Sequence, residues 1–339
     1  MSLADAQARA QVLERLQADS SFLLATHEAP DGDALGSLLA MHGLLIALGK
    51  RAEMFISPSD LPLPYEYSFF DTPRTIQAPP ADIATRTVIL LDCGNIDRNS
   101  ADVLRDGRHL INIDHHHDNT GFGTLNYVVP SASCTAEIVW DLMHDLGIAA
   151  HGRIAEALYV ALITDTGRFM YENTGPRAHQ MAAELIEAGV DVQGIYRRLY
   201  EEMPLAKLQL LARALASVRS YDQGRLTLAS ITLVDLQATG AEESHHEGIV
   251  DQLRAVRGTK VAALVREVEA IDGLLRRKVS LRATDEEFDV SAIARIEGGG
   301  GHRRAAGFTT DLDVQEIAAL LRREIALRLD GEHAAAVSS

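Results

Sequence analysis

The chain has 339 residues, of which 47% are hydrophobic and 24% charged, with a formal net charge of −16. This length is typical of two domains, and the composition is that of a globular protein. The negative charge excludes a broad surface for duplex nucleic acid, which needs clustered lysine and arginine, but a small anionic substrate is compatible with it.

The sequence predicts neither export nor a membrane span. Residues 1–20 read as an amphipathic helix without the apolar core of a signal peptide. No apolar run approaches the roughly 18 residues that cross a bilayer. Cys93 and Cys134 have no metal-type spacing and read as small buried hydrophobes. We therefore expect a cytoplasmic protein that does not bind membranes.

The first half of the chain alternates apolar strands with helical patterns. SFLLAT (21–26) predicts a buried strand, and apolar residues at helical spacing predict a helix over 34–50 that ends near Gly49. Further strands are expected at 51–57, 87–92 and 108–114, and further helices at 153–164 and 177–190. Continuous apolar strands separated by helices indicate a mainly parallel sheet covered on both faces, in an α/β domain over residues 1–190.

The second half predicts a smaller α/β domain. Residues 191–220 have helical periodicity interrupted by Pro204 and are expected to form a helical linker. Residues 221–330 follow as the second domain, with a cleft expected between the two domains. The last nine residues, 331–339, are expected to be disordered. The elements expected in the second domain are strands at 225–232, 261–269, 274–283 and 305–312, and a helix at 314–329.

Candidate functional side chains follow the apolar runs of the first half. His27 comes after the first strand, and the next loop contains Asp31 and Asp33. Asp92 and Asp114 end two further strands, and three histidines, His115 to His117, come directly after Asp114. Asp165 ends a predicted helix. Because ligands collect at the carboxyl ends of parallel strands, we expect one site built from four segments.

Carboxylates mixed with imidazoles favour Mn²⁺, Zn²⁺ or Fe²⁺ over an ion that prefers oxygen ligands alone. Four aspartates and two histidines are too many ligands for one open catalytic ion. Shared between two ions about 3.5–4 Å apart, they suit phosphoryl chemistry. Taken singly, Asp31 or Asp33 reads equally well as a helix cap, and the three histidines as a surface loop. Their joint appearance at successive segment ends favours the metal site.

Four of these segments resemble the signature motifs of the DHH phosphoesterases. They are HEAPDGDALGS (27–37), LLDCGNIDR (90–98), IDHHHDN (113–119) and ITDTGRF (163–169). Residues 278–308, KVSLRATDEEFDVSAIARIEGGGGHRRAAGF, resemble the substrate-binding DHHA1 domain that accompanies this family. The resemblance covers about residues 8 to 328, and the subgroup it indicates is the NrnA-like nanoRNases.

The resemblance implies a role for each residue. His27 and Asp31 would bind one ion, Asp33, His115 and Asp165 the second, and Asp92 both. His116 would face the substrate, while Asp114 and Asn119 would support the histidines. His117 reads as a neighbour of the site. The substrate side would comprise Gly299, Gly300, Gly301, His302, Arg303, Arg282 and Arg168, with the part of Arg304 left open.

The activity implied is hydrolysis of short oligoribonucleotides, such as pGpG or pApA, and of 3′-phosphoadenosine 5′-phosphate (pAp), by a homodimer. The implied cofactor is a pair of divalent ions, Mn²⁺ first, with Mg²⁺, Co²⁺ or Fe²⁺ as alternatives. A cyclic-dinucleotide phosphodiesterase of the same superfamily is a second interpretation. A non-catalytic nucleotide-binding module is a third, which the complete set of six ligands disfavours.

Overall fold

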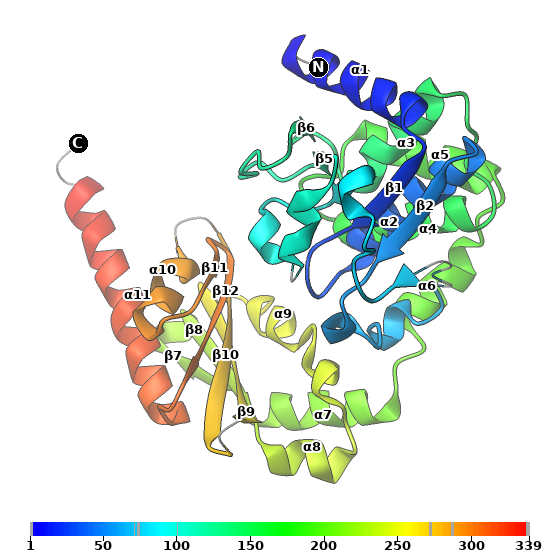
Figure 1. Cartoon of the computed structure of the whole chain (residues 1–339). Helices are drawn as coiled ribbons and strands as arrows, with labels where there is room; N and C mark the ends of the chain where they lie inside the picture. Colours follow the sequence, from blue (N-terminus) through cyan, green and yellow to red (C-terminus); the bar gives the residue numbers. More distant parts are fainter. Residues whose placement is uncertain are drawn as a thin grey trace. The chain divides into compact units, whose positions relative to one another are not determined.

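The computed structural model describes residues 3–70, 72, 75–99, 101–270, 273–285 and 288–336. The chain divides into two compact units, Met1–Glu202 and Met203–Ser339, each with its own sheet (Figure 1). Among the described residues, no helix combines the length and the apolar character that crossing a membrane requires. Cys93 and Cys134 are buried free thiols.

The sheet of the first unit is parallel throughout, and its order is β3-β2-β1-β4-β5-β6. The chain moves outward from β1 in one direction and then returns to build β4 to β6 on the other side. The carboxyl ends of β1 and β4 therefore flank a topological switch point, where open α/β sheets bind ligands. The strands are β1 (Ser21–Ala25), β2 (Arg51–Phe55), β3 (Thr75–Ile76), β4 (Thr87–Leu91), β5 (His109–Asp114) and β6 (Leu125–Val128).

The two faces of this sheet are covered differently. Helices fill one face and pack into a large core with the strands. The opposite face is covered by short 3₁₀ helices, including Ile83–Thr85, Ile96–Arg98 and Asp102–Asp106. The helices of this unit are α1 (Leu3–Ala18), α2 (Gly32–Ala47), α3 (Thr135–Asp145), α4 (Arg153–Asp165), α5 (Pro176–Glu187) and α6 (Val192–Tyr200).

Close packing of α2 on α4 depends on small residues. A Cβ at Gly36 would collide with the Ala157 carbonyl of α4 and would lie 2.7 Å from the Ala161 Cβ. Gly32 likewise lies against the Thr164 side chain. The backbones of the two helices therefore approach closely, which brings the start of α2 to the end of α4.

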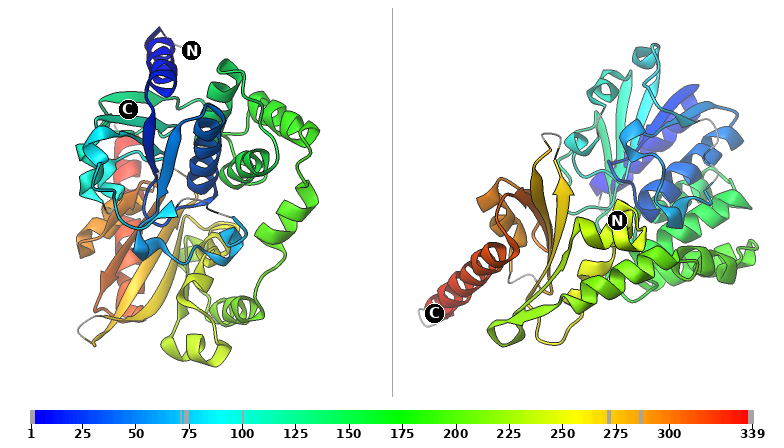
Figure 2. Two further views of the ribbon diagram at one scale, coloured as in Figure 1. Left: turned by 45° about the vertical axis from the view of Figure 1, so that its right-hand side comes forward. Right: turned by 90° about the horizontal axis from the view of Figure 1, so that it is seen from below.

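The second unit has a mixed sheet of order β11-β12-β10-β9-β8-β7, in which only β8 and β9 pair in parallel. Helices α7 and α9 pack on one face, and α10 and α11 pack on the other (Figures 1 and 2). The strands are β7 (Arg219–Tyr221), β8 (Leu226–Ile231), β9 (Val261–Glu269), β10 (Leu275–Ala283), β11 (Gly300–His302) and β12 (Ala305–Thr310). The helices are α7 (Leu205–Ala216), α8 (Leu233–Thr239), α9 (Ile249–Arg254), α10 (Val290–Ala294) and α11 (Val314–Ala336).

Two segments differ from expectation. Residues 191–220 do not form one linker, because α6 packs in the first unit and α7 in the second, with the division at Glu202 and Met203 beside Pro204. The segment expected to be disordered, 331–339, is helical to Ala336. Its run of alanines, the best helix formers, extends α11. Residues 337–339 lie outside the described residues.

Candidate active site

Four segments of the first unit converge at the carboxyl edge of its sheet. His27 follows β1, and Asp92 and His115 follow β4 and β5. Asp31 caps α2, accepting hydrogen bonds at 3.0 and 3.1 Å from two backbone amides of its first turn. Asp165 is the last residue of α4. The close contact of α2 with α4 thus places the first-turn carboxylates near Asp165.

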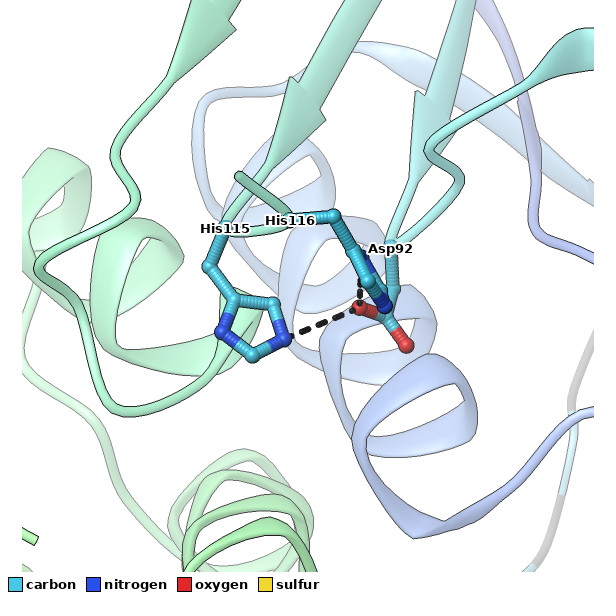
Figure 3. Close-up of side chains that lie close together, drawn as sticks. All are labelled: Asp92, His115 and His116. Atoms are coloured by element: carbon cyan, nitrogen blue, oxygen red, sulfur yellow. Dashed lines mark ion pairs between the residues drawn. The ribbon is translucent and has the colours of Figure 1, made fainter. Parts of the chain in front are cut away.

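The donor atoms form three overlapping groups, and within each group they lie within 4.8 Å of one another. Asp92 belongs to two of the groups and His115 to two. The His115 Nε2 is 3.6 Å from a carboxylate oxygen of Asp92 (Figure 3). It is also 3.6 Å from a carboxylate oxygen of Asp165, and the His27 Nε2 is 3.6 Å from Asp92. The groups are His27, Asp31 and Asp92; Asp33, His115 and Asp165; and Asp92, His115 and His116.

The carboxylates of this site lie close together, and two of them are buried. Asp33 is 1% exposed and Asp92 2%. Burial, together with the charges of Asp92 and Asp165, holds the pKa of Asp33 well above its usual range. Burial also raises the pKa of Asp165 to about 7, although His115 opposes the shift. Bound cations would relieve this repulsion, and the mixed oxygen and nitrogen donors suit transition-metal ions.

Asp92 behaves in the opposite way. Burial alone would raise its pKa, but nearby His27, His115 and His116 lower it below the usual range. Its backbone has φ of 55°, in the left-handed region that side chains other than glycine seldom adopt. This conformation follows directly after β4. Asp92 is therefore an anion that lies between His27 and the pair His115 and His116.

Hydrogen bonds fix the orientation of two histidines. The His27 Nδ1 lies 2.8 Å from the Glu28 carbonyl oxygen, which leaves Nε2 directed toward Asp92. The His116 Nδ1 lies 2.7 Å from Asp114. Burial lowers the pKa of His116, but Asp114 and Asp92 outweigh it and raise that pKa to about 9. Asp114 also accepts a hydrogen bond from the side-chain amide of Asn119 at 2.6 Å. It therefore supports His116 and belongs to none of the three donor groups.

The structure adds supporting residues that the motifs did not indicate. The backbone amides of Thr135 and Ala136, at the start of α3, donate to Asp33 at 2.6 and 3.0 Å. The Thr135 hydroxyl donates to Asp92 at 3.0 Å. The Asn173 amide donates to Asp165 at 3.2 Å. From the sequence, only the start of an apolar helical pattern near Thr135 could have indicated that Thr135 and Ala136 begin a helix.

Comparison with known proteins shows the family of the chain. Residues 21–163 match the family model described as "DHH family, N-terminal domain", and residues 229–327 match the DHHA1 domain. A Thermus thermophilus protein named bifunctional oligoribonuclease and PAP phosphatase NrnA is 36% identical over 311 residues, covering 90% of this chain and 89% of that one. The chain belongs to the DHH family.

Two solved structures share this DHH–DHHA1 fold. An exopolyphosphatase-related protein from Bacteroides fragilis superposes with a TM-score of 0.85 at 21% identity, covering 95% of this chain and 96% of that one. A RecJ from Thermus thermophilus, solved in complex with Mn²⁺, gives a TM-score of 0.54 at 15% identity. That match covers 97% of this chain and 55% of the RecJ chain.

The remaining residues predicted in the DHH domain lie outside the three donor groups. His117 is exposed and belongs to none of them. Arg168 is exposed, has φ of 63°, and places its guanidinium 5.0 Å from the centre of the Tyr200 ring. It is therefore displayed on the surface just after Asp165.

In the DHHA1 domain, part of the predicted glycine loop is a strand, because β11 pairs with β12. A Cβ at Gly299 or Gly301 would collide with the backbone of β12, whereas one at Gly300 would meet open space. Strand packing thus accounts for two of these glycines, and Gly300 is the one left for close approach of a ligand.

The basic residues near this hairpin have different surroundings. Arg303 is exposed. Arg304 donates to the Thr284 carbonyl at 3.3 Å, and Arg282 lies 3.8 Å from Asp251. The side chain of His302 lies outside the described ones. Contact of this hairpin with substrate stays a prediction.

Proposed function

We propose that the protein is a two-metal phosphodiesterase that hydrolyses short oligoribonucleotides to mononucleotides and pAp to AMP. The observation that carries the proposal is the pair of three-ligand groups, His27–Asp31–Asp92 and Asp33–His115–Asp165, which are linked by the 3.6 Å approach of Asp92 to His115. A carboxylate placed between two such groups suits two adjacent cations, which is the arrangement used for in-line phosphoryl displacement. Relatives named oligoribonuclease and PAP phosphatase agree with this chemistry.

In this proposal His27, Asp31 and Asp92 hold one ion, while Asp33, His115 and Asp165 hold the other with Asp92. Bound ions would supply an activated water and stabilise charge on the phosphate oxygens. The carboxylates of Asp33 and Asp92 are oriented by α3, which fixes the metal-binding geometry before substrate arrives. We assign Mn²⁺ as the preferred ion because each group mixes imidazole and carboxylate donors.

His116 is the proposed proton donor. Its Nδ1 is engaged by Asp114, and the charges of Asp114 and Asp92 raise the pKa of the ring in the metal-free protein. A protonated ring can donate from Nε2 to the leaving oxygen or the scissile phosphate. Asp114 and Asn119 act by holding the ring in place.

We assign substrate binding to the DHHA1 domain, through Gly299, Gly300, Gly301, His302, Arg303 and Arg282, with Arg168 contributing from the DHH domain. Glycine amides and arginine side chains bind phosphate well. Basic groups confined to a few positions also reconcile an anionic substrate with the net charge of −16. This confinement favours oligomers of a few nucleotides over long strands or duplexes.

The test is hydrolysis of a graded panel: pApA, pGpG, longer oligoribonucleotides, pAp and cyclic di-AMP, each with Mn²⁺ and with Mg²⁺. We expect mononucleotide from the linear dinucleotides and AMP from pAp, with faster turnover in Mn²⁺. Faster cleavage of cyclic di-AMP than of pApA would assign the protein to the cyclic-dinucleotide phosphodiesterases instead. No turnover of any substrate would refute the enzymatic proposal.

We also propose a homodimer that works in the cytoplasm. Light scattering during gel filtration of the full chain should give twice the mass of one chain. Elution at the mass of a single chain across micromolar concentrations would contradict the dimer. Cell fractionation should recover the protein with the soluble cytoplasmic enzymes.

A further inference from the structure

The segment after Asp165 is a rigid, strained turn. Gly167, Arg168 and Phe169 are three successive residues with φ between 55° and 65°. Residues other than glycine seldom adopt this region because it is strained for them, and such strain clusters at functional sites. The turn thus adopts a costly conformation immediately beside a proposed metal ligand.

Hydrogen bonds close this turn and connect its far end to Asp165. The buried Thr166 carbonyl accepts from the amides of Met170 and Tyr171, both at 3.0 Å. The Asn173 amide returns to the backbone carbonyl and the carboxylate of Asp165, both at 3.2 Å. The side chains displayed by the turn therefore have fixed positions relative to Asp165.

Two large side chains of this turn, a methionine and a tyrosine, are exposed to solvent. Met170 is 81% exposed and Tyr171 53%. The Tyr171 ring lies over Gly167, where a Cβ would come within 2.5 Å of the ring. Packing on a glycine orients the ring without burying it. Large apolar side chains that are exposed to solvent together often mark the binding site of a ligand.

Aromatic groups of α6 extend this surface. Tyr196 is 38% exposed, and its ring centre lies 5.1 Å from that of Tyr200. Arg168 stacks over Tyr200 at 5.0 Å. Burial raises the pKa of Tyr200 to about 12, and the neighbouring phenols of Tyr171 and Tyr196 act in the same direction. The turn and α6 thus share one cluster of rings and a guanidinium.

We propose that the Tyr171 ring, with Met170 and Arg168, forms a stacking surface that binds a nucleobase of the substrate beside the metal centre. Tyrosine rings and guanidinium planes are the groups on which proteins stack the bases of single-stranded RNA. In a chain of charge −16, stacking supplies affinity that phosphate neutralisation does not. The inference rests on the proposed function and names the part of the substrate that this surface reads.

The experiment compares Tyr171→Ala with the parent on pApA and on two analogues of pApA, each lacking one adenine. Stacking on one base is worth roughly a 5- to 150-fold change in affinity, so KM for pApA should rise within that range while kcat stays within about twofold. On the analogue that lacks the stacked adenine, variant and parent should have equal KM. Tyr171→Phe, which keeps the ring, should restore most of the affinity lost in the alanine variant.

Two controls separate stacking from a structural role. Ile186→Ala removes an equally exposed apolar side chain from α5 and should leave KM unchanged. Mn²⁺ affinity of Tyr171→Ala, measured by calorimetry, should equal that of the parent. Weaker Mn²⁺ binding, an equal rise in KM for all three substrates, or no change in KM would overturn the inference.

Failure of the proposed function is distinguishable from failure of this inference. A parent protein that does not cleave pApA would overturn both. A parent that cleaves pApA, with a Tyr171→Ala variant of unchanged KM, would overturn the stacking surface alone.

Discussion

Asp92 links the two donor groups, and its backbone conformation decides which substitution tests it. Asparagine tolerates the left-handed region better than alanine, so Asp92→Asn removes the charge with least disturbance of the turn. We expect kcat/KM for pApA to fall at least about a hundredfold, because both metal-binding groups lose a carboxylate. Circular dichroism of the metal-free variant should match the parent. Near-parental activity would refute the shared role of Asp92.

Asp165 predicts a pH dependence of the metal-free protein. Its folded-state pKa of about 7 exceeds the unfolded value of 3.8, so the folded state binds more protons between these values. Stability therefore falls as pH rises from about 4 to 7, and Asp31 and Asp33, whose pKa values are also raised, act in the same direction. Asp165→Asn should weaken this decline.

Thermal melting in a chelator at several pH values measures the effect. A change of 1 kcal/mol corresponds to about 2–4 °C in a protein unit of this size. The parent should lose more melting temperature between pH 5 and pH 7.5 than Asp165→Asn does. Identical pH profiles for the two proteins would contradict the predicted role of this carboxyl.

At the scale of secondary-structure elements, the contact between α2 and α4 sets the distance between ligands on the two helices. Gly36→Ala would force the helices apart, and overpacking of this kind costs about 1–3 kcal/mol. We expect lower thermal stability and weaker Mn²⁺ binding, measured by calorimetry. Gly175→Ala is the matched control, because its Cβ would meet open space at an ordinary φ of −102°. Equal effects of both substitutions would argue against this account.

The start of α3 orients the metal-binding carboxylates. Thr135→Val keeps the shape of the side chain but removes the hydroxyl that donates to Asp92. We expect activity to fall about 10- to 100-fold, as is usual when the partner of a metal ligand is removed. Thr227→Val, in the core of the second unit, removes a buried hydroxyl far along the chain and should affect stability alone. Full activity of Thr135→Val would show that the backbone amides of α3 suffice.

At this scale the sequence predicts those site residues that lie at the ends of apolar strands and helices. His27, Asp31, Asp92 and Asp165 each follow or cap a recognisable apolar element, so local periodicity locates them. Thr135 meets Asp33 across 102 positions, and no local pattern marks such a contact. The short 3₁₀ helices of the second face escape prediction because runs of three to five residues are too short to show a periodicity.

At the scale of the molecule, metal removal should affect stability as well as turnover. Chelation leaves Asp31, Asp33, Asp92 and Asp165 without a cation, and any ion that binds only the folded state stabilises it by mass action. We expect EDTA to abolish hydrolysis of pApA and to lower the melting temperature of the DHH domain. Added Mn²⁺ should restore both. A melting temperature insensitive to metal would contradict the two-ion centre.

The six proposed metal ligands all come from the first unit, within residues 27–165. In the proposal the second unit contributes none of them and supplies most of the groups that bind the phosphates of the substrate. Mutations in the second unit can therefore alter which phosphoester is accepted while the bond-breaking residues stay unchanged. After gene duplication, substitutions in the second unit can change the substrate while the metal ligands are kept. Relatives with different substrates should therefore differ most in their DHHA1 domains.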